Sequence, residues 1–489
     1  MTPEGAILGA IAVPLAGAAL IGAAHRVPNL REGVTLVTAA ALFLLVATLA
    51  PEVLAGGRPQ VHVAEVMPGI ALAFRVEPLG MLFALVASGL WIVNSLYSIG
   101  YMRGNREGHQ TRFYICFAAA LASTMGIAFA GNLFTLFLFY EALTLVTYPL
   151  VTHHGTGEAL RAGRFYLALL IGSSIALLLV AIVWTWLIAG TIEFTAGGIF
   201  GGQASNATVG LLLALYVFGI GKAAVMPVHR WLPAAMVAPT PVSALLHAVA
   251  VVKAGVFAVV KVVVYVFGVD AIAGLKSVDW LPFVSGFTII AASIVALRSD
   301  NLKRRLAYST VSQLSYVVLA AALLTPLSVI GAALHIATHA LGKITLFFCA
   351  GAIYTASHKT EVSELDGIGR RMPWTMAAFT VGALSLIGVP PAAGFVSKWF
   401  ILSGALQAGN HLAVAVLVAS TLLNAAYFLP IVHAAFFRRG ADDAHATHGE
   451  APWPMVIALT LTAGATIALF FAADLPLALA RQLVSGPAG

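Results

Sequence analysis

Long apolar stretches separated by short polar loops dominate the chain, and their length predicts the kind of helix that each one forms. A helix rises about 1.5 Å per residue, so about 20 apolar residues cross the hydrocarbon core of a bilayer. Fourteen stretches approach or exceed this length, at residues 5–23, 33–54, 77–100, 113–130, 132–152, 165–190, 207–227, 241–268, 280–297, 306–323, 327–355, 374–405, 410–437 and 452–480. The pattern therefore predicts an all-α integral membrane protein with about 14 transmembrane helices.

Two of these stretches are interrupted, so we expect helices 7 and 12 to be broken. Between Lys222 and Lys253, four prolines interrupt the backbone: Pro227, Pro233, Pro239 and Pro241. The twelfth stretch is too long for one crossing and contains GVPPAAGF at 388–395. Broken backbone at membrane depth is tolerated only where protein or water satisfies the freed amides and carbonyls. Separately, the alternation over 59–76 predicts a short hairpin in an outer loop.

Composition and charge agree with a membrane protein. Of the 489 residues, 60% are hydrophobic and 9% are charged, and the mean hydropathy is +0.96, whereas soluble proteins have about 25% charged residues. The formal net charge of +7 would suggest a nucleic-acid partner in a soluble chain, but here 17 of 26 lysines and arginines fall in alternate loops on one side. The positive-inside rule makes that side cytoplasmic and places both termini outside. The acidic N-terminus lacks the basic region of a secretory signal, so the first stretch is expected to stay as a helix.

Ionisable side chains inside the apolar stretches are few, and they carry the candidate chemistry. A charge at bilayer depth costs roughly 2.5–3.5 kcal/mol on insertion scales, so it normally faces a protein interior or a wet cavity. His335, His339 and Lys343 recur every four residues, share one helical face and could form a polar file across the membrane. The complete set, which we interpret as the lining of an ion path, is Glu141, Lys222, His247, Lys253, Lys261, His335, His339, Lys343 and Lys398.

Several of these residues also have a structural interpretation. Lys261 lies eight residues beyond Lys253, near a helix end, where its amine could simply extend to the surface. His247 could cap or bond a carbonyl in the broken region. Glu141 and Lys222 could form a structural ion pair, although buried pairs are poor stabilisers. We interpret His433, near an inner helix end, as structural.

An internal symmetry accompanies the broken helices. Lys222 and Lys398 are 176 residues apart, a distance that covers five helices, so a second copy would enter the membrane from the opposite side. Inverted repeats with broken helices near the midplane recur in transporters. We therefore predict N-terminal helices 1–3 with the hairpin at 1–112, a first repeat (helices 4–8) at 113–268, a second repeat (helices 9–13) at 269–437, and helix 14 at 438–489.

Three segments, WLPAAMVAPTPVSALLHAVAVVKAG, HIATHALGKITLFFCAG and GVPPAAGFVSKWFIL, resemble signature segments of one superfamily. It comprises the antiporter-like membrane subunits shared by respiratory complex I, membrane-bound hydrogenases and Mrp-type multisubunit cation/proton antiporters. The resemblance spans about residues 75–430. It implies a proton path, in a bacterial inner (plasma) membrane, through Glu141, Lys222, Lys253, His335, His339, Lys343 and Lys398, with His247 and Lys261 as further candidates.

Departures from the superfamily pattern narrow the choice of member. Ala234 stands where many relatives have Asp or Asn, Lys398 disfavours the complex I member whose path ends in glutamate, and Trp399 disfavours the largest member. The GxPPxxGFxxK form resembles the Mrp D-type subunit and the smallest complex I antiporter-like subunit, whereas APTPVSALLHA is more similar to the Mrp A-type subunit. The resemblance thus implies a proton-translocating subunit of a multisubunit Na+/H+ antiporter. The alternatives are a proton-pumping subunit of a complex I-like NADH:quinone oxidoreductase or hydrogenase, and a subunit coupled to another process or serving as a scaffold.

Reactive groups of other kinds are missing from the sequence. Cys116 and Cys349 are too few for a metal site or a disulfide framework, and there is no nucleophile triad or dinucleotide fingerprint. We expect a secondary ion transporter subunit that is not itself an enzyme, with no cofactor, metal or catalytic residue of its own. Its expected partners are other membrane subunits, the lipid bilayer, protons and monovalent cations, and no nucleic acid.

Overall fold

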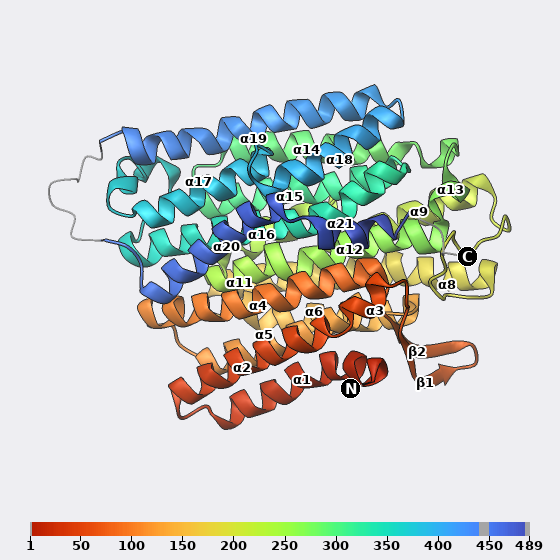
Figure 1. Ribbon diagram of the computed structural model, residues 1–489, viewed down its shortest axis with the longest axis horizontal. Helices are drawn as coiled ribbons and strands as arrows, with labels where there is room; N and C mark the ends of the chain where they lie inside the picture. The colour runs from red at the N-terminus through yellow and green to blue at the C-terminus, as the bar shows by residue number, and fades with distance from the viewer. Residues whose placement is uncertain (1, 440–448, 485–489) are drawn as a thin grey trace.

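The computed structural model describes residues 2–439 and 449–484, except the side chains of residues 246 and 247. Its helices run across the view in Figure 1, with α1 and α2 at one margin, α19 at the opposite margin, and α12 and α16 between them. The helices are α1 (Pro3–Ala23), α2 (Pro28–Ala47), α3 (Ala50–Leu54), α4 (Pro78–Gly104), α5 (Gln110–Ala128), α6 (Leu133–Val151), α7 (Gly157–Ser173), α8 (Val180–Ala189), α9 (Asn206–Gly219), α10 (Trp231–Ala234), α11 (Thr240–Ala244), α12 (Val251–Val262), α13 (Val269–Ile272), α14 (Trp280–Arg298), α15 (Leu302–Ala322), α16 (Pro326–Ser357), α17 (Pro373–Ile387), α18 (Ala393–Gln407), α19 (His411–Phe437), α20 (Trp453–Phe471) and α21 (Asp474–Arg481).

Helical residues cover each of the fourteen predicted stretches. Within the described residues, ten helices are long and apolar enough to cross a membrane. Four predicted stretches do not reach that standard as single helices: α9 is short, the helix over 240–267 is interrupted at Ala250, α15 is more polar, and the twelfth stretch is divided into α17 and α18. A mostly helical membrane fold is confirmed, and the count of fourteen crossings stays a prediction.

Both predicted helix breaks are present. Helix α9 ends at Gly219, and short 3-10 turns at Gly221–Ala223 and Val228–Arg230 follow before α10 begins. Helix α17 ends at Ile387, and α18 begins at Ala393. Gly388 after α17 has a φ of +92°, a left-handed conformation that glycine adopts without steric cost. The sequence-based prediction of broken helices 7 and 12 is therefore confirmed at the level of the backbone.

The predicted hairpin is present as strands β1 (Gln60–Met67) and β2 (Ile70–Arg75), which pair antiparallel. The backbone amide of Arg75 donates to the carbonyl of Phe129 at 2.7 Å, and Gly131 donates to Ala73 at 2.9 Å. These bonds attach β2 to the turn between α5 and α6. The hairpin thus extends from the same end of the bundle as that turn (Figure 1).

Burial divides the bundle into a centre and a periphery. In an apolar segment of 18 residues in α16, 94% of the residues are buried. In comparable segments of α1 and of the helix over 157–189, 33% and 28% of the residues are buried. The peripheral helices therefore present apolar faces suited to lipid or to neighbouring subunits. In contrast, any polar group on α16 must find its hydrogen-bond partners inside the protein, because water does not reach it freely.

Candidate functional site

Lys222 lies in the break after α9, and its side chain is fully buried. Its Nζ donates to the carbonyl oxygen of Tyr140 at 2.7 Å and to Oγ1 of Thr144 at 2.6 Å, both on α6. The same amine lies 3.2 Å from the centroid of the Tyr140 ring. A desolvated cation over an aromatic face gains about 2 kcal/mol. The described contacts of the Lys222 amine are therefore with two residues of α6, Tyr140 and Thr144.

Glu141 follows Tyr140 on α6 and is partly buried. Its carboxylate is not among the described hydrogen-bond partners of Lys222, which are Tyr140 and Thr144. One carboxylate oxygen of Glu141 is buried and receives no hydrogen bond from any described residue. Burying a carboxylate oxygen without a hydrogen-bond donor costs free energy, and a functional role of Glu141 would explain its presence here. The alternative interpretation, a direct Glu141–Lys222 ion pair, is not what the structure describes, because the amine of Lys222 contacts Tyr140 and Thr144 of the same helix.

Lys253 and His339 connect two central helices. Lys253 on α12 is fully buried, and its Nζ lies 2.5 Å from Nδ1 of His339 on α16, a hydrogen-bond distance. Gly255, two residues further along α12, packs against the backbone of Lys222 so closely that an added Cβ would collide with it. The absence of a side chain at Gly255 thus lets the segment with Lys222 lie directly on the helix that carries Lys253.

His335 extends the polar contacts from α16 to α15 and α18. Its Nδ1 lies 2.9 Å from Oγ of Ser397, and its Nε2 lies 3.1 Å from Oε1 of Gln313. The rings of His335 and His339 stack with their centroids 5.8 Å apart. Gln313 in turn donates through Nε2 to the carbonyl oxygen of Leu386 at 3.4 Å. Both nitrogens of the His335 ring are therefore within hydrogen-bond distance of a polar side chain.

Lys398 lies on α18, just after the second break, and its amine reaches back to the end of α17. Its Nζ donates to the carbonyl oxygens of Leu386 at 2.7 Å and Ile387 at 3.1 Å, the last two residues of α17. Leu386 therefore accepts hydrogen bonds from both Gln313 and Lys398. Unlike Lys222 and Lys253, the side chain of Lys398 is only partly buried. The contacts from Lys253 to Lys398 thus form one series, with the stacked histidine rings as the step that lacks a direct hydrogen bond.

Lys222 and Lys398, the two lysines beside the helix breaks, share a second feature. The amine of Lys398 lies 4.7 Å from the ring centroid of Tyr316, just as Lys222 lies over Tyr140. Tyr316 follows Tyr140 by 176 residues, the same offset that separates the two lysines. Equivalent lysine–tyrosine pairs therefore occur at equivalent positions of the two predicted repeats.

The other predicted residues lie apart from this series. Lys343 donates to the carbonyl of Leu306 at 3.2 Å and to Oγ of Ser309 at 2.9 Å, so it contacts α15 although it shares a face of α16 with the two histidines. Lys261 is fully buried and donates to the carbonyl of Ala130 at 2.6 Å, so it does not extend to the surface. The side chain of His247 lies outside the described part of the chain. His433 is exposed on α19.

A cavity of about 260 Å³ lies near the loops that follow α4 and α6. Thr240, at the start of α11, lines it together with Lys303, whose Nζ donates to the carbonyl of Ala238 at 2.6 Å. The other lining residues are Tyr101, Glu107, His154, Met236, Val237, Ala238, Asn301, Leu302, Ala350, Tyr354, Lys359 and Thr360. Sequence reasoning missed this site, and its one visible signal is the His153–His154 pair in a loop, which apolar patterning alone does not interpret.

The carboxylate of Glu107 lies near both histidines of that loop. It lies 3.4 Å from Nε2 of His154 and 3.8 Å from Nε2 of His153. The hydrogen bond with Glu107 raises the pKa of His154, whereas burial lowers the pKa of His153 to about 4. Adjacent imidazoles thus differ in the pH at which each accepts a proton. Within the described residues, no three His, Cys, Asp or Glu side chains gather as a metal site requires.

Replacing His154 with glutamine should lower stability only at acidic pH. Because the folded-state pKa of His154 lies above its unfolded value, its stabilisation is complete below about 6.5 and is lost as pH rises through the folded value. Thermal unfolding of both forms from about pH 5 to about pH 9 should therefore show a difference that shrinks with rising pH. His62→Gln, at an exposed position of β1, is the control. A difference that grows with pH would contradict this assignment.

Comparison with known proteins places this geometry in a family. A family model described as NADH:quinone oxidoreductase/Mrp antiporter, TM matches residues 130–424. NADH-quinone oxidoreductase subunit N of Desulforudis audaxviator (strain MP104C) is 34% identical over 415 residues, which cover 83% of this chain and 81% of that protein. The D-type subunit of the Na(+)/H(+) antiporter of Alkalihalophilus pseudofirmus is 28% identical over 399 residues, covering 80% and 79%.

Solved structures show the same fold. A chain of the Mrp complex from Dietzia sp. DQ12-45-1b matches with a TM-score of 0.87 at 23% identity, covering 99% of this chain and 97% of that one. At such low identity this likeness establishes the fold alone. The family assignment depends on the sequence matches, which span more than half of the chain. This chain therefore belongs to the NADH:quinone oxidoreductase/Mrp antiporter transmembrane family, as the resemblance of its segments predicted.

Proposed function

We propose that this protein is the proton-translocating subunit of a multisubunit monovalent cation/proton antiporter. Protons would move near the midplane along Glu141, Lys222, Lys253, His335, His339 and Lys398, with Lys343 and Lys261 as side branches. The observation that carries the proposal is the series of contacts from Lys253 through the two histidines and Gln313 to Lys398. Burying several amines and imidazoles in a membrane bundle costs free energy, and proton transfer would explain why these groups form one series of contacts.

The entrance would be the 260 Å³ cavity beside Thr240. Thr240 begins α11, and a π-helical turn at Leu245–Val249 and then α12 continue from it to Lys253. A proton that reaches this cavity is thus about three to four helical turns from the first central lysine, at about 5.4 Å per turn. Glu107 and His154 at the cavity wall are groups that exchange protons with water.

Coupling between the two halves would be electrostatic. The segments that carry Lys222 and Lys253 pack against each other, because Gly255 lies directly on the backbone of Lys222. Two unit charges attract or repel with an energy that falls with distance and rises as the dielectric constant falls, so a proton arriving at one amine favours release from the other. Glu141 on α6 provides the opposite charge that favours the protonated form of Lys222.

The matching lysine–tyrosine pairs at Lys222–Tyr140 and Lys398–Tyr316 support the predicted inverted repeats at 113–268 and 269–437. In such a repeat each half supplies one broken helix and one lysine near the midplane. We retain the prediction of fourteen crossings, with both termini on the outer side of a bacterial inner membrane. The exit would lie at the partly buried Lys398.

The choice between antiport and redox-driven pumping depends on partners. The relative from the Na(+)/H(+) antiporter of Alkalihalophilus pseudofirmus matches 80% of this chain, which favours a monovalent cation as the coupled ion. A specific observation favours a second candidate: the relative named NADH-quinone oxidoreductase subunit N is more similar, at 34% identity. Under that candidate, the chain would move protons in a complex whose electron-transfer chemistry belongs to other subunits.

Everted membrane vesicles that contain the whole complex separate these two functions. Proton flux is followed with a pH-sensitive dye after addition of Na+, K+ or choline, without NADH or another electron donor. Flux that follows Na+ or K+ but not choline supports the antiporter. Flux that requires an electron donor and ignores the added cation overturns the antiporter assignment and supports the redox complex. Vesicles from cells lacking the complex provide the background.

A further inference from the structure

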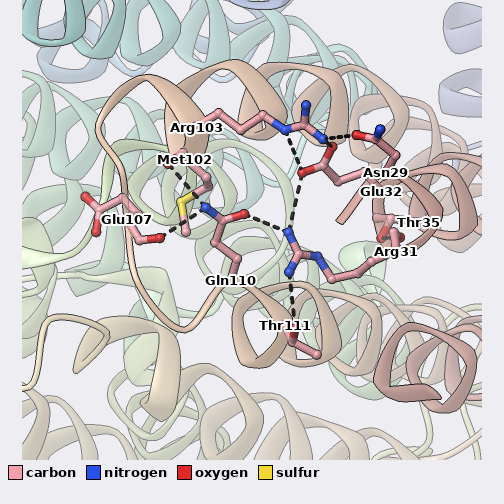
Figure 2. Close-up of polar contacts among 9 residues, drawn as sticks. All are labelled: Asn29, Arg31, Glu32, Thr35, Met102, Arg103, Glu107, Gln110 and Thr111. Carbon is pink, nitrogen blue, oxygen red and sulfur yellow. Dashed lines mark hydrogen bonds and ion pairs between the residues drawn. The ribbon is translucent and has the colours of Figure 1, made fainter. Parts of the chain in front are cut away.

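An ionic network joins the start of α2 to the end of α4 and the start of α5 (Figure 2). Arg31 and Glu32, near the start of α2, are 5% and 4% exposed. Arg31 donates to Oε1 of Gln110 at 2.7 Å and to Oγ1 of Thr111 at 3.2 Å, both on α5. Arg103, in the last turn of α4, donates through Nε to Glu32 at 3.1 Å. Three helices are thus fastened at one end by charged groups.

Arg31 and Arg103 both pair with one carboxylate, that of Glu32. The hydrogen bond from Arg31 to this carboxylate is 3.4 Å long. The Nε of Arg31 is buried and has no hydrogen-bond acceptor among the described residues. An arginine at 5% exposure with an incomplete set of acceptors is unfavourable unless a further anion approaches.

An open cavity of about 520 Å³ adjoins Arg31. Its lining residues are His25, Pro28, Arg31, His109, Gln110, Thr111 and Arg112, and none of these described residues is acidic. Pro28 begins α2 and Gln110 begins α5, so the amino ends of two long helices meet there. Helix amino ends carry partial positive charge and present free amides to anions. Cations, two helix ends and an incompletely paired buried guanidinium all favour an anionic ligand.

The surroundings of the cavity indicate which anion. Leu20, Val27 and Leu30, at the adjoining ends of α1 and α2, are 57%, 52% and 56% exposed. Exposed apolar side chains beside a cationic cavity suit a molecule with acyl chains below a charged headgroup. The loops here belong to the side that the positive-inside rule makes cytoplasmic, where anionic lipids lie in the inner leaflet.

We propose that this cavity binds the phosphodiester headgroup of an anionic phospholipid. The phosphate would accept hydrogen bonds from Arg31 and Arg112, and the acyl chains would lie along Val27 and Leu30. Basic pockets between transmembrane helices are typical sites for such headgroups. The lipid would complete the charge balance of the network in Figure 2 and hold the pair α1–α2 against α4 and α5.

The test measures phosphatidylglycerol binding to the purified, delipidated complex by native mass spectrometry. Arg112→Gln removes an exposed lining cation, whose contact is the carbonyl of His153 at 3.0 Å, and leaves Arg31, Glu32 and Arg103 intact. Binding should weaken about fivefold, the contribution of one arginine near an anionic headgroup. Arg112→Lys keeps the charge and should bind within about twofold of the unchanged protein. Arg26→Gln, an exposed arginine beside His25 that does not line the cavity, is the matched control and should have no effect.

Several outcomes would overturn the proposal. Unchanged binding in Arg112→Gln, or an equal loss in Arg26→Gln, would show that the cavity is not the site. Equal binding of phosphatidylcholine would remove the requirement for an anionic lipid. Displacement of phosphatidylglycerol by an equal concentration of inorganic phosphate would assign the cavity to a free anion. Loss of binding in Arg112→Lys to the level of Arg112→Gln would contradict the role of charge.

Discussion

Replacing Lys222 with methionine is expected to reduce cation-dependent proton flux about 100-fold, close to the background of vesicles that lack the complex. Methionine preserves most of the side-chain length and fits a buried site, but it cannot carry a proton. The carbonyl of Tyr140 and the hydroxyl of Thr144 would lose the amine that they contact at 2.7 and 2.6 Å. The backbone of Lys222 packs on α12 at Gly255. Loss of the Lys222 amine would therefore also separate Lys253 from the first half of the proposed path.

The measurement is proton flux in vesicles, normalised to the amount of assembled complex on native gels. Lys276→Met is the control, because this lysine is exposed at the start of the 3-10 turn Lys276–Val278 and is not among the described hydrogen-bond partners of the proposed path. It should retain the flux of the unchanged protein. Full flux in an assembled Lys222→Met complex would refute the role of Lys222 as a proton carrier.

The second large effect is expected at the junction between α12 and α16. Replacing His339 with leucine removes the group that lies 2.5 Å from the amine of Lys253. Lys253 would be left fully buried without that contact, and the series of contacts would end there. We expect flux to fall about 100-fold, the lower range for loss of a positioned proton-transfer group.

His433→Leu is the matched control for this variant, because His433 is an exposed histidine on α19. It should transport protons as the unchanged protein does. Substantial flux in assembled His339→Leu would show that Lys253 passes its proton elsewhere, and Lys343 on the same face of α16 would be the next residue to replace.

The helix breaks and the buried lysines are predictable because they violate local rules. Prolines and GVPPAAGF interrupt an apolar pattern, and a lysine inside such a pattern is conspicuous without any knowledge of its neighbours. The groups that contact these lysines are not predictable in this way. Thr144, Gln313 and Ser397 are uncharged and fit within apolar helices, so they leave no mark in the hydropathy pattern. Their roles depend on which helices lie together, a property of the tertiary fold.

Charges at the edges of the apolar stretches are harder to interpret from the sequence. The pattern assigns Arg31 and Arg103 to loops, yet Arg31 is 5% exposed and both arginines bond to residues of other helices. Lys261 shows the converse problem. Its place near a helix end makes extension to the surface a reasonable interpretation, but the carbonyl of Ala130, in a segment distant in sequence, holds it inside. In both cases the partner comes from a different helix or turn.

The hydrogen bonds of Lys398 have a consequence for how a proton could leave the protein. The amine is held by Leu386 and Ile387, at the carbonyl end of α17, and no acidic side chain among the described residues is bonded to it. A peptide oxygen stabilises the ammonium but cannot take its proton. Departure therefore requires a base that is not part of this cradle, and the simplest one is a water molecule entering beside the partly buried side chain. Hydration of this one amine, rather than movement of a whole helix, would then act as the gate for release of the proton.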